Sequence, residues 1–207
     1  ERGRPRKIVD GIGWIFGIPS KILLWNWQAN NHRVSDHTQN ELIGYMAANS
    51  LDSTKVRINQ YRPLDEWRRL GKNKRVGAGW RYTVGAVHTL GDTIFPGRLI
   101  GGDHYNPYTD TVHIYSDIPA LALEQSAYAK DVHQRPYPGT YAVVYDLPFV
   151  RLWREHQNKE DVFSYVDMYG TTRERVQARH PLQPQFGSEV GSDIGRLVPL
   201  VQPLTQL

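Results

Sequence analysis

The stretch TVHIYSDIPALALEQSAYAKD, residues 111–131, decides the fold. Its beginning, TVHIYS, has the β-branched and aromatic residues that are typical of a strand. Proline is favoured in the first turn of a helix, so Pro119 indicates a helix that starts at Ser116 or Asp117. The positions that follow have the spacing of a buried helical face: Ile118, Leu121, Ala122, Gln125, Ala129 and Val132. The stretch therefore predicts a strand that leads directly into an amphipathic helix.

Three further helices are predicted outside this stretch. Residues 35–51 begin with Ser35 or Asp36, which can cap free backbone amides, and continue with an apolar face. Residues 63–71 begin with a proline and end at a glycine, which are the usual start and stop signals. The third helix is predicted over residues 149–170.

Strands are predicted over residues 55–61, 79–90 and 98–116, where β-type residues are separated by Gly, Pro and Asn. The turn YNPYTD, residues 105–110, joins the two halves of the last segment as a hairpin, because proline at 107 presets φ. We expect residues 111–117 to form an edge strand. This order of helices and strands predicts an α+β domain with a small mixed sheet.

Composition and length predict one folded domain with two extensions. The chain has 207 residues, of which 40% are hydrophobic and 22% charged, which excludes a disordered chain. The absence of cysteine excludes disulfides and thiolate metal sites. We expect a basic and apolar Trp-rich extension at 1–30, the α+β domain at 31–180 and a Pro/Gly-rich arm at 181–207. The arm carries glycines at 187, 191 and 195 and is expected to drape over a surface.

The N-terminal extension is the most apolar part of the chain. Within residues 8–27, Asp10 and Lys21 bracket an uncharged run of ten, whereas a membrane span requires about 20 apolar residues. One interpretation is that the segment packs over the core or against a partner subunit. The other is that it lies at a bilayer interface, because tryptophans and a basic arm adjoin there. The residues expected to make the contact are Trp14, Phe16, Trp25 and Trp27.

Residues 98–165 resemble the zincin-like metallopeptidases of gluzincin type, in which a helix carries the motif His-Glu-x-x-His. The segment LEQSAYAKD, residues 123–131, stands where that motif would stand. Glu124 takes the place of the first histidine, Gln125 that of the glutamate and Tyr128 that of the second histidine. The resemblance implies a zincin-like domain in which the helix is a degenerate active-site helix.

The resemblance also implies an acidic third ligand on the next helix and a substrate that adds to an edge strand. Glu155 would be that ligand, with Asp161 as the second choice. The coarser alternative is an ordinary amphipathic helix that never held a metal.

The three replacements remove the chemistry of a zinc peptidase. A tyrosine phenol, with a pKa of about 10, is a poor metal ligand at neutral pH, and Gln125 cannot accept a proton from water. We therefore expect a non-catalytic pseudo-metallopeptidase without a cofactor, an accessory or scaffold subunit of a larger, membrane-associated assembly. Protein subunits are the first expected partners and a membrane surface the second, in a bacterium; nucleic acid is not expected, despite the basic and aromatic residues at 66–81.

The alternative function is a metal-dependent hydrolase with a rearranged zinc site. Its ligands would be Glu124, Glu155, His104 and His113. The two histidines lie on the predicted hairpin together with Asp103 and Asp110, so a tight turn would bring them together across the strands. Histidines in such strands are otherwise packed or hydrogen-bonded.

Overall fold

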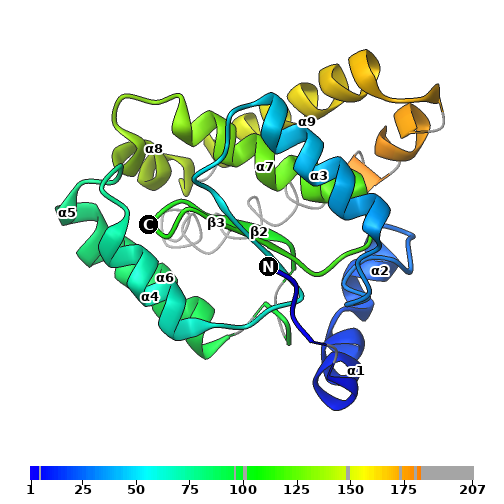
Figure 1. Ribbon diagram of the computed structural model, residues 1–207, viewed down its shortest axis with the longest axis horizontal. Helices are drawn as coiled ribbons and strands as arrows, with labels where there is room; N and C mark the ends of the chain where they lie inside the picture. Colours follow the sequence, from blue (N-terminus) through cyan, green and yellow to red (C-terminus); the bar gives the residue numbers. More distant parts are fainter. Residues whose placement is uncertain are drawn as a thin grey trace, which may run out of the picture.

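A mixed sheet of short strands forms in the computed structural model, which describes residues 1–4, 6–95, 97–99, 102–147, 150–172, 174–179 and 181–182. The strands are β1 (Lys55–Ile58), β2 (His104–Asn106) and β3 (Thr111–Ile114), in the order β1-β3-β2. β1 runs parallel to β3, and β2 runs antiparallel to it. Helices cover both faces of the sheet (Figure 1). The α+β class and the hairpin of residues 104–114 are confirmed.

The prediction that residues 111–117 form an edge strand is wrong. β3 lies in the middle of the sheet because β1 returns to pair with it in parallel, Lys55 opposite Thr111. The outer edge of β1 is also covered, since the amide of Gly3 donates to the carbonyl of Ile58 over 2.8 Å. A substrate strand cannot add to β3, as the resemblance to zincins would require.

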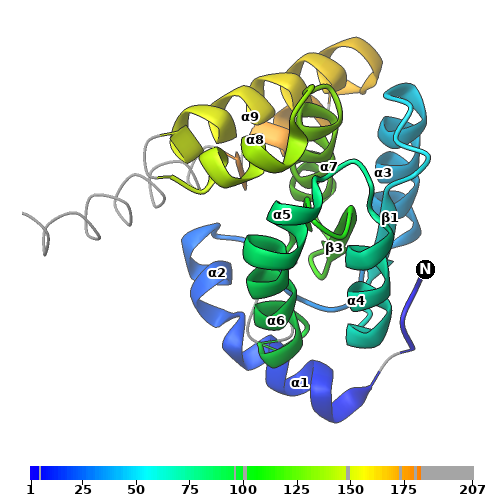
Figure 2. The same ribbon diagram turned by 90° about the vertical axis from the view of Figure 1, so that its left-hand side faces the viewer.

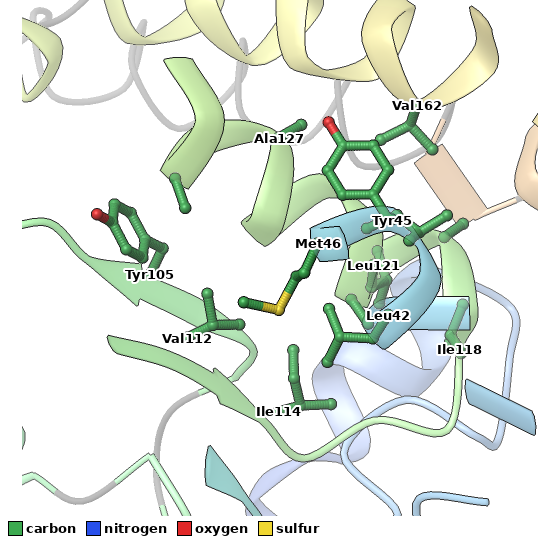
Figure 3. Close-up of a cluster of buried hydrophobic side chains, with 14 of the residues drawn as sticks. Leu42, Tyr45, Met46, Tyr105, Val112, Ile114, Ile118, Leu121, Ala127 and Val162 are labelled. Carbon is green, nitrogen blue, oxygen red and sulfur yellow. The ribbon is translucent and has the colours of Figure 1, made fainter. Parts of the chain in front are cut away.

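Four helices cover one face of the sheet: α3 (Asp36–Ala48), α7 (Pro119–His133), α8 (Pro138–Tyr145) and α9 (Val150–Tyr169). Val112 and Ile114 project from β3 into this layer and meet Leu42 and Met46 of α3 and Leu121 of α7 (Figure 3). α7 is buried along most of its length, between α3 on one side and α9 on the other. The helix predicted from residues 111–131 is therefore the centre of the core.

The other face is covered by α4 (Pro63–Lys72), α5 (Ala78–Trp80), η1 (Arg81–Gly85) and α6 (Ala86–Ile94). The strand predicted over residues 79–90 is wrong, because this segment is helical. Its tryptophan, valines and threonines favour strands in isolation, but tertiary contacts decide. Gly85 packs directly on Tyr108, where a Cβ would lie 2.9 Å from the tyrosine side chain. The hydroxyl of Thr89 donates to the carbonyl of Gly85 over 2.8 Å, as helical threonines often do.

The N-terminal helices α1 (Lys7–Phe16) and α2 (Ile18–Leu23) lie at the end of the molecule away from α8 and α9 (Figure 2). None of the helices among the described residues is long and apolar enough to cross a membrane. The glycines at 187, 191 and 195, and the arm from 183 onward, lie outside the described residues.

Ser35 caps α3 and ties it to the chain that enters α7. Its hydroxyl accepts from the amide of Thr38 over 3.3 Å and donates to Asp117 over 2.6 Å. We expect Ser35→Ala to lower the free energy of unfolding by about 1–2 kcal/mol, the usual cost of a lost N-cap. Urea denaturation measures the loss. Asn40→Ala, at an exposed position of the same helix, is the control, and an equal loss in both variants would contradict the capping role.

Candidate functional site

The three positions carried over from the zinc motif lie on α7, and Glu124 and Tyr128 both lie close to Tyr145 of α8. Tyr128 packs among aromatic rings: its ring stacks on Tyr145 at 4.0 Å between centroids and meets the edge of Tyr105 at 5.3 Å. Burial raises the pKa of Tyr128 well above its ordinary value, so the phenol stays protonated. Tyr128 therefore serves the core and cannot act as an anionic ligand.

Glu124 points from α7 toward α9, where Lys159 and Glu155 lie. Its Oε1 is 3.7 Å from the ammonium nitrogen of Lys159. Burial raises the pKa of Glu124 to about 7, and Lys159 opposes this rise while Glu155 adds to it. Glu155 in turn accepts a hydrogen bond from Arg151, one turn away, over 2.7 Å. We call Glu124, Glu155 and Lys159 the interhelical cluster.

The interhelical cluster holds two helices together inside the protein. Glu124 is 4% exposed and Glu155 8%, so neither carboxylate is open to a polymeric substrate. Asp161, the second choice for a third ligand, accepts from the hydroxyl of Tyr45 and pairs with Lys130 at 2.5 Å. These contacts fasten α9 to α3 and α7. The acidic residues on α9 thus have structural partners.

The histidines of the hairpin lie on the opposite face of the sheet. Side chains alternate between the faces of a strand, so His113 points away from Val112 and Ile114, which face α7. His104 is the cross-strand partner of His113, and their rings stack 4.5 Å apart with an angle of 9°. The predicted approach of the two histidines is confirmed. Glu124 and Glu155 lie in the other layer, so the four ligands proposed for the rearranged zinc site are divided by the sheet.

The aspartates predicted to join the histidines are engaged elsewhere. Asp103 accepts from the amides of Tyr115 and Ser116 over 2.6 and 3.0 Å. Asp110 pairs with His133 of α7 at 2.8 Å. The carboxylates that do reach the hairpin histidines come from Asp92 on α6 and Glu66 on α4.

Asp92 and Glu66 were not among the ligands predicted from the sequence. Both stand on helices that cross the sheet face, at positions distant from the hairpin in the chain. A strand was predicted over residues 79–90, but this segment is helical, and it is helix α6 that presents Asp92 to the sheet. No local pattern in the sequence around Asp92 or Glu66 points to the hairpin histidines.

The pKa values of the two histidines shift in opposite directions. Burial, together with the charge of His104, lowers the pKa of His113 well below its ordinary value, so this ring is neutral at pH 7. Burial also acts to lower the pKa of His104, but the carboxylate of Asp92 outweighs it and raises that pKa. The reverse holds for Asp92: burial would raise its pKa, and His104 lowers it.

A second feature is an exposed apolar surface on α1 and α2. The four aromatic residues predicted to make a contact are all exposed: Trp14 40%, Phe16 58%, Trp25 82% and Trp27 69%. Trp14 and Trp27 stack on each other, with 6.3 Å between centroids. Further exposed apolar side chains lie on α1 and α2, near these aromatic residues in the chain: Ile8, Ile12, Ile15, Ile22 and Leu23. We call these nine residues the N-terminal apolar surface.

No family model matches this chain, and no curated protein or solved structure matches it either. The resemblance to zincin-like metallopeptidases stays a prediction.

Proposed function

We propose that this protein is a non-catalytic accessory protein that attaches to an anionic membrane surface through the N-terminal apolar surface. The observation that carries the proposal is the orientation of α1. This amphipathic helix turns its polar and small residues toward the protein and its apolar stripe outward.

The inner side of α1 is fixed by close contacts. Asp10 pairs with Arg98 at 2.6 Å. Gly13 packs so tightly that a Cβ would lie 2.3 Å from the carbonyl oxygen of Arg98. Ile8, Ile12, Ile15 and Phe16 stand at the spacing of one helical stripe on the opposite side, and all are exposed. An amphipathic helix that binds a bilayer surface presents its apolar face in this way.

The backbone at Trp25 supports a role for exposed tryptophan. This residue follows the end of α2 with φ of 49°, in the left-handed region where glycine is usual. A bulky residue there costs roughly 1–2 kcal/mol. The fold retains this cost at a residue whose indole is 82% exposed, which is consistent with a functional role for the side chain. Indoles settle at the headgroup level of bilayers, which matches this position.

Positive charge adjoins the apolar surface. Arg4, Arg6 and Lys7 are exposed at the start of α1. Each basic residue near an anionic leaflet contributes about 1 kcal/mol of attraction. The combination of basic side chains with exposed isoleucine, phenylalanine and tryptophan favours anionic lipid over a purely apolar protein partner.

The non-catalytic part of the proposal is supported by the interhelical cluster. The position of the catalytic glutamate is held by Gln125, and the positions of the histidines by a buried glutamate and a tyrosine packed among rings. These residues contribute packing and ion pairing between α7 and its neighbours. On this proposal α7 is a structural helix that packs against α3, α8 and α9.

The proposal is tested by vesicle sedimentation of the full chain with phosphatidylcholine vesicles and with vesicles that also contain phosphatidylserine. We expect binding to the second kind, and Ile15→Asp/Phe16→Asp should weaken it more than tenfold. Burial of each such side chain is worth about 1.5–3 kcal/mol, and 1.4 kcal/mol is a tenfold change.

Met168→Asp/Val176→Asp is the matched control, because it adds the same charge at two exposed apolar positions outside the N-terminal region. This variant should bind as the unmodified chain does. Absence of binding to both kinds of vesicle would overturn the proposal. Equal loss in both variants would assign the effect to net charge and would also count against it.

A further inference from the structure

We infer that Asp92, His104, His113 and Glu66 form a binding site for a divalent transition-metal ion, on the sheet face away from α7. The site is independent of the proposed attachment to a membrane. It is also distinct from the motif helix, because β3 and the core lie between them.

Three donor atoms lie close together, at separations slightly wider than a bound metal requires. One ligand atom from each of Asp92, His104 and His113 falls within 4.8 Å of the others. His104 Nε2 and Asp92 Oδ1 are 3.5 Å apart. A tetrahedral zinc ion with bonds of about 2.0–2.1 Å separates its donors by about 3.3 Å. Glu66 lies next to this group, with Oε2 3.9 Å from His113 Nε2, and is proposed as the fourth donor.

The two histidines and Glu66 each direct a buried atom without a hydrogen-bond partner toward the cluster. Within the described part of the chain, neither ring nitrogen of His113 has a hydrogen-bond partner, nor do His104 Nε2 and Glu66 Oε2. His113 is 5% exposed and Glu66 3%. Buried polar atoms without a partner cost stability, so native proteins retain few of them. Donor atoms held for a metal explain why several occur together here.

In three of the four side chains, a hydrogen bond to the other polar atom fixes the orientation of the side chain, as is usual for metal ligands. His104 Nδ1 lies 3.0 Å from the carbonyl oxygen of Gly102, which leaves Nε2 as the lone-pair atom. Asp92 Oδ2 accepts from the side-chain amide nitrogen, Nδ2, of Asn106 over 2.8 Å, which leaves Oδ1. Glu66 Oε1 accepts from the guanidinium of Arg57, which leaves Oε2.

Space and access also fit a single ion. A cavity of about 10 Å³ adjoins Glu66, Asp92, His104 and His113. This volume is close to the least space that one water molecule or one ion requires. The side chains of His104 and Asp92 are 32% and 27% exposed, so the ion can reach the site from solvent. Two imidazoles and two carboxylates suit zinc or another first-row divalent metal better than calcium or magnesium, which prefer oxygen alone.

The site is tested on the full chain after removal of metal with a chelator, by titration with Zn²⁺ in a calorimeter. Elemental mass spectrometry of the dialysed complex gives the stoichiometry. We expect about one zinc per chain, and a tetrahedral absorption spectrum with Co²⁺ in place of zinc. Loss of an orienting group alone weakens metal sites 10–100-fold, so Asp92→Asn and His113→Gln should each weaken binding more than about 100-fold.

His37→Gln is the matched control, because His37, Glu41 and Glu174 form a more exposed group of possible ligands elsewhere. It should leave zinc binding unchanged. The site would be refuted by absence of saturable binding, by unchanged affinity in Asp92→Asn, or by loss of the zinc in His37→Gln. If His113→Gln fails to fold, Asp92→Asn decides alone, since it replaces one carboxylate oxygen with an NH2 group and keeps the side-chain shape.

Discussion

Replacement of Arg57 by methionine is expected to lower the free energy of unfolding by about 3–5 kcal/mol, the usual cost of removing one partner of a buried ion pair. Arg57 has no exposed surface and donates to Glu66, Asp65 and Gln60. Without the guanidinium, the carboxylate of Glu66 is left in the interior with its charge uncompensated. Urea unfolding at neutral pH, with chelator present, measures the loss.

A double variant distinguishes two causes of the loss: the uncompensated charge of Glu66 and the missing packing of the Arg57 side chain. Arg57→Met/Glu66→Met removes both charges, and we expect it to recover a large part of the stability, because buried pairs can be replaced by apolar residues at little cost. Arg2→Met is the surface control: its pair with Asp36 is exposed, and such pairs contribute about 0–1 kcal/mol. If the double variant is as unstable as Arg57→Met, the loss comes from packing and the electrostatic explanation fails.

The second large effect is a dependence of stability on pH that comes from Glu124. The pKa of Glu124 is about 7 in the folded protein, against an ordinary value of 4.5. Below pH 4.5 both states hold the proton; as pH rises from 4.5 to 7 the unfolded state loses it first, which lowers the stability of the fold. One pKa unit is worth 1.36 kcal/mol, so the loss amounts to about 3 kcal/mol.

Glu124→Gln removes this titration. We expect the variant to gain about 3 kcal/mol relative to the unmodified chain between pH 4.5 and pH 8, whatever the offset between them at low pH. Urea unfolding across this range measures the difference. Glu160→Gln, which replaces an exposed glutamate on α9, is the control. Parallel curves for Glu124→Gln and the unmodified chain would show that burial does not raise this pKa.

The parts of the fold that follow from local sequence could be predicted. Pro119 and the apolar spacing after it gave α7, Ser35 gave the start of α3, and YNPYTD gave the hairpin. Residues 79–90 could not be predicted in this way, because their β-favouring side chains are outweighed by the packing of Gly85 on Tyr108. The middle position of β3 also depends on pairing with a distant strand, to which no local pattern points.

The residues of the two candidate sites also differ in whether local sequence or tertiary packing brings them together. The two histidines could be paired from the hairpin alone, since a turn fixes which residues face each other. The carboxylates could not, because α4 and α6 bring Glu66 and Asp92 to the sheet only through tertiary packing. The tryptophans singled out from the sequence are exposed, whereas the outward rotation of α1 depends on Asp10 and Arg98, which are far apart in the chain.

The parallel pairing of β1 with β3 has a consequence for synthesis. Lys55 pairs with Thr111, 56 residues later, so β1 has no partner in β3 until that part of the chain has left the ribosome. The apolar face of α3 likewise has no α7 to pack against until the residues from 119 onward have been synthesised. Non-local pairings of this kind slow folding and leave strands and apolar surfaces open to wrong contacts. The nascent chain is therefore expected to need protection by a chaperone during the interval between these two elements.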